Sequence, residues 1–194
     1  MKIARNFMLF LVLGLLGYPQ VSGAQISDAP GVTVPSTSSP TTLPTGVTLR
    51  SGISYDSSSP SDLLDAYLPK PSEVPAPAVV LIHGGGWVSG SRTDLSSEAA
   101  RFAAAGFAAF TIDYRLEDPG DCLKQGPEGS DLLVCPAANP IPWVDPIEDA
   151  QTAVMYVIDN ASDFNINPKR VGVLGASAGG WIAGMLATIG LASN

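Results

Sequence analysis

The sequence predicts a domain of the α/β class, with a mostly parallel sheet and helices on both faces. Three observations support this prediction. Short apolar segments of strand character alternate with longer segments of helical character, which implies parallel strands joined by right-handed crossovers. The apolar segments are continuous rather than alternating, so both faces of the sheet are expected to be covered. The 170 residues after residue 24 are enough for one domain with a sizeable core.

The first 24 residues have the pattern of a secretory signal peptide. Lys2 and Arg5 give a positive start, residues 7–18 form an apolar run, and the small residues at 21–24 offer a cleavage site. A membrane anchor is the alternative, but the run is shorter than the ~20 apolar residues that span a bilayer. We therefore expect a secreted, extracellular protein with no stable membrane anchor.

Residues 25–46 are rich in Ser, Thr and Pro and carry one charged side chain, Asp28. Such a stretch buries too little apolar surface to offset its ordering entropy, so we expect a linker. The alternative is a loosely packed N-terminal arm of the domain. The formal net charge is −8 and becomes −10 without Lys2 and Arg5. This acidity argues against nucleic acid and anionic membrane surfaces as partners.

The folded domain is expected to occupy residues 47–194. Two segments of strand character, 47–55 and 63–68, are expected to form an antiparallel pair at its start. The other predicted elements then alternate along the chain: strand 78–82, helix 93–105, strand 107–112, helix 145–160, strand 170–174 and helix 178–189.

Local signals set the ends of these elements. Pro69 follows the second strand, and Gly106 stops the first helix. Asp145 fits the N-cap of the second helix, and Pro146 fits its first helical position. The apolar residues of this helix fall near a spacing of 3.6 residues and give it a face to pack on the sheet: Ala150, Ala153, Val154, Val157 and Ile158.

The two cysteines, Cys122 and Cys135, lie in a long loop between residues 116 and 142. An oxidising compartment favours a disulfide between them, worth about 3 kcal/mol in the chain-entropy model. Two free thiols are the alternative. Two cysteines and one distant histidine do not supply four ligands at zinc spacing, so no metal site is expected.

Residues 175–179 read Gly-Ala-Ser-Ala-Gly between an apolar strand and a helix of small residues. Gly-x-Ser-x-Gly is the pattern of a nucleophile elbow, in which a sharp turn strains the serine backbone and exposes its hydroxyl. Gly175 and Gly179 are needed because side chains there would clash. Ser177 also lies at a helix N-terminus, which favours negative charge. The pattern predicts Ser177 as a nucleophile, with an ordinary strand–helix turn as the alternative.

A second glycine-rich motif, residues 83–87 (His-Gly-Gly-Gly-Trp), directly follows a predicted buried strand. Consecutive glycines let backbone N–H groups turn toward a ligand. Together with the N–H of Ala178 they could bind the oxyanion of a tetrahedral intermediate, each donor contributing about 3–4 kcal/mol. A phosphate-binding loop is the alternative, but no lysine lies near the glycines and no nucleotide motif is present. A flexible connector is the other alternative.

These motifs, with Asp113–Leu116, the helix at Asp149 and residues 167–171, resemble the α/β-hydrolase superfamily between about residues 47 and 191. The resemblance is to its esterase/lipase group, which includes hormone-sensitive-lipase-like and feruloyl- or acetyl-esterase-like carboxylesterases. It implies the α/β-hydrolase fold, in which helices cover both faces of a mostly parallel sheet.

By this resemblance, Ser177 maps to the nucleophile, and Gly84, Gly85 and Ala178 map to the oxyanion donors. The implied activity is hydrolysis of carboxylic esters through an acyl-enzyme, without a cofactor. The implied partner is a small-molecule or polymer-linked ester.

The sequence departs from the family pattern after the nucleophile. The family places its acid and its histidine there, but no Asp, Glu or His follows Ser177. The resemblance gives His83, the one histidine, the task of bracing the glycine loop, and Asp113 and Asp149 are expected to be structural. Strand 171–174 would become an edge strand. We therefore expect the N-terminal part of a longer hydrolase, lacking its C-terminal strands. The alternative is a remnant, or a protein that binds an ester or glycan without turnover.

Overall fold

The computed structural model describes residues 42–59, 62–116 and 145–189. The predicted signal peptide, all but the last five residues of the predicted linker, and both cysteines of the predicted disulfide lie outside the described residues. Within the described ranges, no helix has the length and apolar character needed to cross a bilayer.

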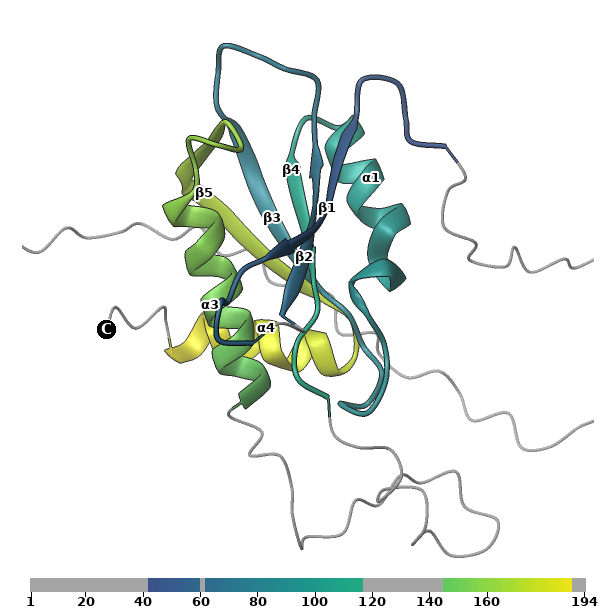
Figure 1. Cartoon of the computed structure of the whole chain (residues 1–194), viewed down its shortest axis with the longest axis vertical. Helices are drawn as coiled ribbons and strands as arrows, with labels where there is room; N and C mark the ends of the chain where they lie inside the picture. Colours follow the sequence, from purple (N-terminus) through teal and green to yellow (C-terminus); the bar gives the residue numbers. More distant parts are fainter. Residues whose placement is uncertain (1–41, 60–61, 117–144, 190–194) are drawn as a thin grey trace, which may run out of the picture.

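A five-stranded sheet forms the centre of the described domain (Figure 1). Its strands lie in the order β1-β2-β4-β3-β5, so neighbours in space are not always neighbours in sequence. β1 pairs antiparallel with β2, and β2 with β4, whereas β3 runs parallel to both β4 and β5. Four strands therefore run one way and β2 the other, which confirms the predicted mostly parallel sheet. The bounds are β1 Thr48–Ser54, β2 Leu63–Leu68, β3 Ala76–Ile82, β4 Ala108–Ile112 and β5 Ile166–Gly175.

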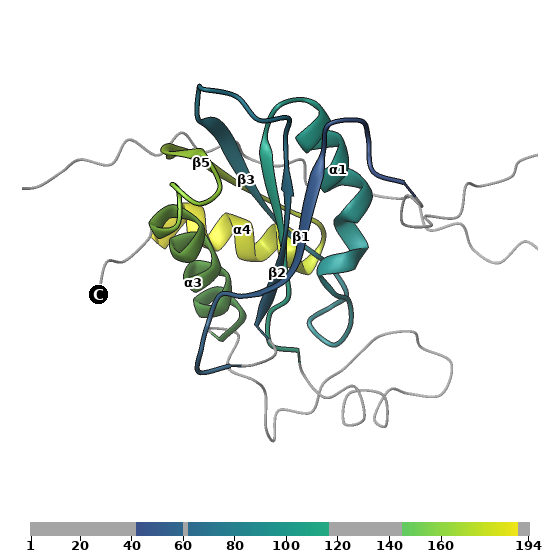
Figure 2. The same cartoon turned by 45° about the horizontal axis from the view of Figure 1, so that its top comes forward.

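Helices cover both faces of this sheet, as predicted (Figures 1 and 2). Helix α1 (Ser96–Ala104), preceded by the 3₁₀ turn η1 (Arg92–Leu95), packs on one face through buried alanines. Helices α3 (Asp145–Asp159) and α4 (Ala178–Ile189) pack on the other face. The small side chains of α1 let the helix approach the sheet closely, and the larger core lies under α3 and α4.

The larger core is centred on Phe110 of β4, which is fully buried. Its ring meets that of Phe164 edge to face, with 5.0 Å between ring centroids. This arrangement suits aromatic quadrupoles and adds to the stabilisation from apolar burial. Phe164 lies in the turn that leads from α3 into β5, so the contact fixes the strand that carries the elbow.

Strand β5 begins earlier than the predicted strand 170–174. It starts at Ile166 and includes Pro168, although proline has no N–H to donate. Among the described residues β5 pairs with β3 alone, and its register with β3 shifts between Ala76 and Ala78, close to this proline. A proline is tolerated at such an edge irregularity. The predicted strand start at residue 170 is therefore four positions too late.

Candidate active site

Ser177 lies in the turn between β5 and α4, at the carboxyl end of the parallel strands. Its φ is 51°, in the left-handed region that residues with a side chain rarely adopt. Two hydrogen bonds shape the turn: Ala176 N–H donates to Ile82 O at 3.1 Å, and Gly179 N–H donates to Ala176 O at 2.9 Å. The residue is exposed. The elbow thus presents Ser177 at the edge of the sheet in a strained conformation.

The two glycines of the elbow are required by close backbone packing. A Cβ at Gly175 would collide with the carbonyl oxygen of Gly179. A Cβ at Gly179 would collide with the carbonyl oxygens of Ile82 and His83 at the end of β3. Backbone atoms of a central strand cannot move aside cheaply, so the start of α4 lies against the beginning of the glycine loop.

The glycine loop lies directly against Ser177. A Cβ at Gly84 would be 3.1 Å from the Cβ of Ser177 and 2.9 Å from Ala176 O. Gly85 has a φ of 120°, and its carbonyl accepts the N–H groups of Val88 and Ser89, each at 3.2 Å.

Ala178, the third predicted donor residue, follows Ser177 and begins α4. The N–H groups of a helix's first turn have no acceptor within the helix. The structure therefore places two of the three predicted donor residues, Gly84 and Ala178, beside Ser177, and Gly85 follows Gly84 in the loop.

His83 is buried in the base of the glycine loop, with 1% of its surface exposed. Its Nδ1 lies 2.7 Å from Gly84 O, and its ring stacks on Tyr114 with centroids 4.3 Å apart. The hydroxyl of Tyr114 donates to His83 O at 3.0 Å, and burial raises the pKa of this tyrosine to about 12. These contacts hold the imidazole against its own loop, which is the bracing position that the resemblance implies.

Gly90 is a part of this loop that the sequence motif missed. Its φ is 102°, and a Cβ there would collide with His83 Nδ1 and Gly84 O. The chain therefore folds back onto His83 beyond the last residue of the motif. In the sequence, a glycine within a polar stretch indicates a turn, but it does not indicate which side chain that turn packs against.

Asp113 follows β4 and is held by Arg92. The Arg92 Nη1 lies 2.6 Å from Asp113 Oδ2, and its Nε lies 2.9 Å from Asp65 Oδ1. The backbone N–H of Arg92 also donates to Asp113 Oδ1 at 2.7 Å. Arg92 thus joins β2 and the end of β4 to the turn that follows the glycine loop, and Asp113 has the structural position that the sequence suggested.

Asp149 lies on α3 and binds Arg115, just after β4. The Arg115 backbone N–H donates to Asp149 Oδ2 at 2.9 Å, and the guanidinium Nη2 donates to Oδ1 at 2.7 Å. This pairing raises the pKa of Arg115 and keeps it charged. Asp145, one turn earlier, also binds the guanidinium, at 3.0 Å. Asp149 therefore ties α3 to the sheet.

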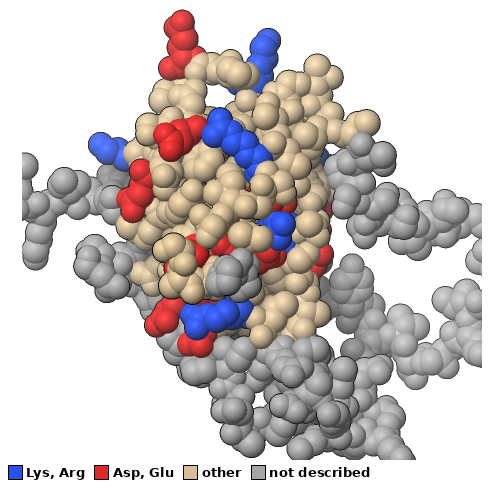
Figure 3. All heavy atoms as spheres, viewed as in Figure 1, with Lys and Arg blue, Asp and Glu red and all other residues tan. Residues whose placement is uncertain are grey.

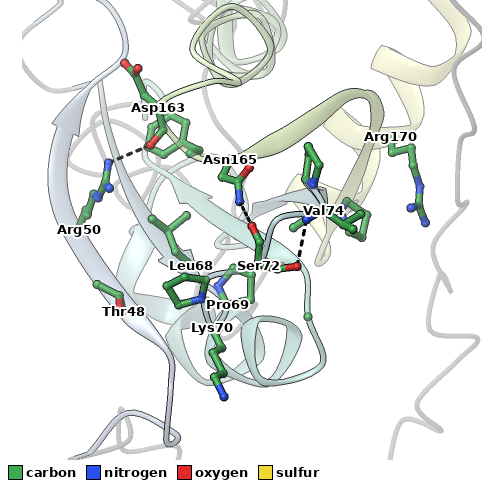
Figure 4. Close-up of a pocket in the computed structure, with 16 residues that line it drawn as sticks. Thr48, Arg50, Leu68, Pro69, Lys70, Ser72, Val74, Asp163, Asn165 and Arg170 are labelled. Carbon is green, nitrogen blue, oxygen red and sulfur yellow. Dashed lines mark hydrogen bonds between the residues drawn. The ribbon is translucent and has the colours of Figure 1, made fainter.

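A hollow of about 460 Å³ lies at the opposite edge of the sheet (Figure 4). It lies between the end of β2, the start of β3 and the turn before β5. Asn165 Nδ2 donates to Ser72 O at 2.7 Å, and Arg50 Nη1 donates to Asp163 O at 3.3 Å, which ties its walls together. None of its lining residues belongs to the elbow or to the glycine loop, so it is separate from the candidate active site.

Charged side chains of both signs are interspersed on the face of the domain shown in Figure 3. In the part of the chain that the structure describes, no three His, Cys, Asp or Glu side chains gather closely enough to hold a metal ion.

Comparison with known proteins identifies relatives of this arrangement. The BD-FAE family model matches residues 64–122 and 137–194. The carboxylesterase NlhH of Mycobacterium tuberculosis is 33% identical over 115 residues, which cover 58% of this chain and 29% of NlhH. The esterase LipC of the same organism is 31% identical over 137 residues, covering 70% of this chain and 28% of LipC. The chain thus spans less than a third of the length of these relatives.

Solved esterase structures share the fold. Butyrate-bound esterase 2 of Thermogutta terrifontis has a TM-score of 0.53 at 26% identity, covering 72% of this chain and 43% of that one. A bacterial heroin esterase has a TM-score of 0.55 at 26% identity, covering 75% and 41%. The family model covers more than half of the chain, and the sheet order, the elbow and the glycine loop accompany it. The chain therefore belongs to the BD-FAE family, within the α/β-hydrolase superfamily.

Proposed function

We propose that this protein is a secreted serine hydrolase that cleaves carboxylic esters through an acyl-enzyme at Ser177. The observation that carries the proposal is the contact between the strained Ser177, at φ 51°, and Gly84 of the glycine loop. This contact places Gly84, one of the proposed backbone donors, beside the proposed nucleophile. The names of the relatives, carboxylesterase and esterase, support the same reaction class.

In the proposed reaction, Ser177 Oγ attacks the ester carbonyl carbon and forms a tetrahedral intermediate. The N–H groups of Gly84, Gly85 and Ala178 donate to its oxyanion, and the positive end of α4 adds to this stabilisation. Collapse of the intermediate breaks the bond to the alcohol and leaves an acyl group on Ser177. Water then attacks the acyl carbonyl and releases the acid. These steps need no cofactor.

The reaction also needs a general base, and His83 is not available for that task. It is the one histidine among the 194 residues, and its ring is stacked on Tyr114 with Nδ1 facing Gly84 O. In the proposed mechanism the base and its acid partner are therefore supplied by groups outside these residues. They would take the proton of Ser177 and later activate the water.

The same observation about His83 favours a second candidate, a protein that binds an ester or glycan without turnover. Hydrolysis of p-nitrophenyl acetate separates the two. Turnover that Ser177→Ala abolishes supports the hydrolase, and binding of an ester with neither turnover nor labelling of Ser177 by an organophosphonate supports the second candidate. Capture of an organophosphonate on Ser177, located by peptide mass spectrometry, reports on the nucleophile even where turnover is slow.

Secretion is tested separately, by expressing the full chain with its own N-terminus and sequencing the exported product. Cleavage after Ala24 supports the proposed signal peptide. Retention of the uncleaved chain in the cell contradicts it.

A further inference from the structure

Two tryptophans form an aromatic pair beside the candidate nucleophile. The rings of Trp87 and Trp181 meet edge to face at 82°, with centroids 6.0 Å apart. Trp87 belongs to the glycine loop, and Trp181 lies in the first turn of α4. The backbone N–H of Trp181 donates to Ser177 O at 3.1 Å. Helical side chains lean toward the helix N-terminus, so the indole of Trp181 covers the turn that carries Ser177.

The partner of Trp181 has a strained backbone. Gly85, Gly86 and Trp87 have consecutive φ values of 120°, 62° and 66°, all in the left-handed region. Glycine adopts this region freely, but a bulky residue does so only where its surroundings hold it. The hydrogen bonds from Val88 and Ser89 to Gly85 O close the turn within the loop itself. The contact with Trp181 differs because it joins the loop to the nucleophile helix.

We propose that Trp181 is a positioning residue. It holds Trp87 in its left-handed conformation and thereby fixes the glycine loop against Ser177. This rests on the proposed function, in which that loop supplies the oxyanion donors. Both indoles remain more than a third exposed, at 37% and 38%, so the pair lies outside the hydrophobic core. Its removal is therefore expected to loosen the loop without unfolding the sheet.

Amide hydrogen exchange of the full chain, followed by NMR, tests whether Trp181 holds the glycine loop and does not require catalysis. In Trp181→Ala the amides of Val88 and Ser89 should exchange about 3- to 10-fold faster, as expected for loss of one aromatic pair. The amide of Val80, in the core of the sheet, should keep its rate. Unchanged exchange at Val88 and Ser89, or an equal increase at Val80, would overturn the proposal.

Two further variants make this test specific. Trp181→Phe keeps an aromatic ring on α4 and should restore most of the protection. Phe102→Ala removes another edge-to-face pair, between Phe102 and Phe107 with centroids 5.7 Å apart, on the α1 side of the sheet. It should leave Val88 and Ser89 unchanged. Two outcomes would contradict a local positioning role for Trp181: Trp181→Phe fails to restore protection, or Phe102→Ala speeds exchange at Val88 and Ser89 as much as Trp181→Ala does.

A double-mutant cycle tests the route through Trp87. Trp87→Gly removes both the ring and the strain, since glycine adopts a φ of 66° freely. In that background Trp181→Ala should cause no further increase in exchange. An increase as large as in the wild-type background would show that Trp181 acts on the loop by another route.

Catalysis gives a separate readout. If the chain hydrolyses p-nitrophenyl acetate, Trp181→Ala should lower kcat by about 3- to 10-fold with KM retained, because the displaced donors serve the transition state. Faster exchange with an unchanged kcat would overturn the link to chemistry. If an organophosphonate also fails to label Ser177, the proposed function fails, while the exchange data still decide whether Trp181 holds the glycine loop.

Discussion

Alanine is expected to have opposite effects at two glycines of helix α4. Gly184 lies in the helix interior, and a Cβ there meets no atom within 4 Å. Gly179 lies in the first turn, where a Cβ would collide with the carbonyl oxygens of Ile82 and His83. The two substitutions are chemically identical and lie in the same helix. A destabilisation at Gly179 that is absent at Gly184 therefore reports on the packing of the elbow against β3.

The structure sets the expected size of this difference. Replacing glycine by alanine in an exposed helix interior stabilises a protein by up to about 1 kcal/mol, so Gly184→Ala should gain about 0.5–1 kcal/mol. The gain in helix propensity is smaller at Gly179, because this residue lies at the start of the helix. Overpacking costs about 1–3 kcal/mol, and backbone neighbours place Gly179→Ala toward the upper part of that range. The free energies of unfolding of the two variants should therefore differ by about 2–4 kcal/mol.

Urea unfolding of the full chain, followed by far-UV circular dichroism, measures this difference. With a slope of about 2 kcal/mol per molar urea, the two midpoints should lie about 1–2 M apart, with wild type between them. A midpoint for Gly179→Ala at or above that of wild type would refute the reasoning. It would mean that α4 can move away from β3 at little cost, and that the contact between elbow and glycine loop is loose.

Three further outcomes are expected. Asp149→Asn should lower the free energy of unfolding by about 2 kcal/mol in the same urea assay, because it weakens charge-assisted bonds to a buried carboxylate, whereas Asp145→Asn, at a more exposed pair, should cost less than about 1 kcal/mol. Ser177→Gly should raise the melting temperature, because glycine relieves the left-handed strain at a gain of about 1 kcal/mol, and Ser177→Ala, which keeps the Cβ, should not. Burial raises the pKa of Asp62, and the charge of Asp149 raises it further. The protonated carboxyl of Asp62 therefore contributes stability that is complete below the unfolded pKa of about 4. This contribution is lost as the pH rises through the folded pKa. Urea titrations between acidic and neutral pH should therefore show Asp62→Asn gaining stability relative to wild type as the pH rises, and a constant difference would contradict this.

Elements that depend on local patterns could be predicted from the sequence. The apolar run that became β3, the glycine stop after α1 and the start of α4 at Ala178 all follow from neighbouring residues. The elbow was predictable for the same reason, because its geometry is set by small residues within five positions. The early start of β5 was not, because Pro168 is tolerated by an edge irregularity that exists only once the strands are paired.

Contacts between distant segments were beyond the reach of sequence patterns. Arg92 and Asp65 are 27 positions apart, and Arg115 and Asp149 are 34 apart, so no local spacing links the partners. The contact between Trp87 and Trp181 is of the same kind, since it depends on how the elbow packs on the end of β3. The two motifs of the candidate site are visible in the sequence, and the structure adds how they pack together.

The packing of the elbow against the glycine loop explains why the lone histidine, His83, is held within that loop. Gly179 of the elbow packs against the carbonyl oxygen of His83, while Tyr114 donates to that same oxygen from the end of β4. The imidazole is stacked on Tyr114, with Nδ1 on Gly84 O. Turning His83 toward Ser177 would break the stacking and the Nδ1 contact, and would leave Gly84 O without its partner. His83 therefore serves the proposed chemistry by holding the donors in place, and the proton of Ser177 must be taken by another group.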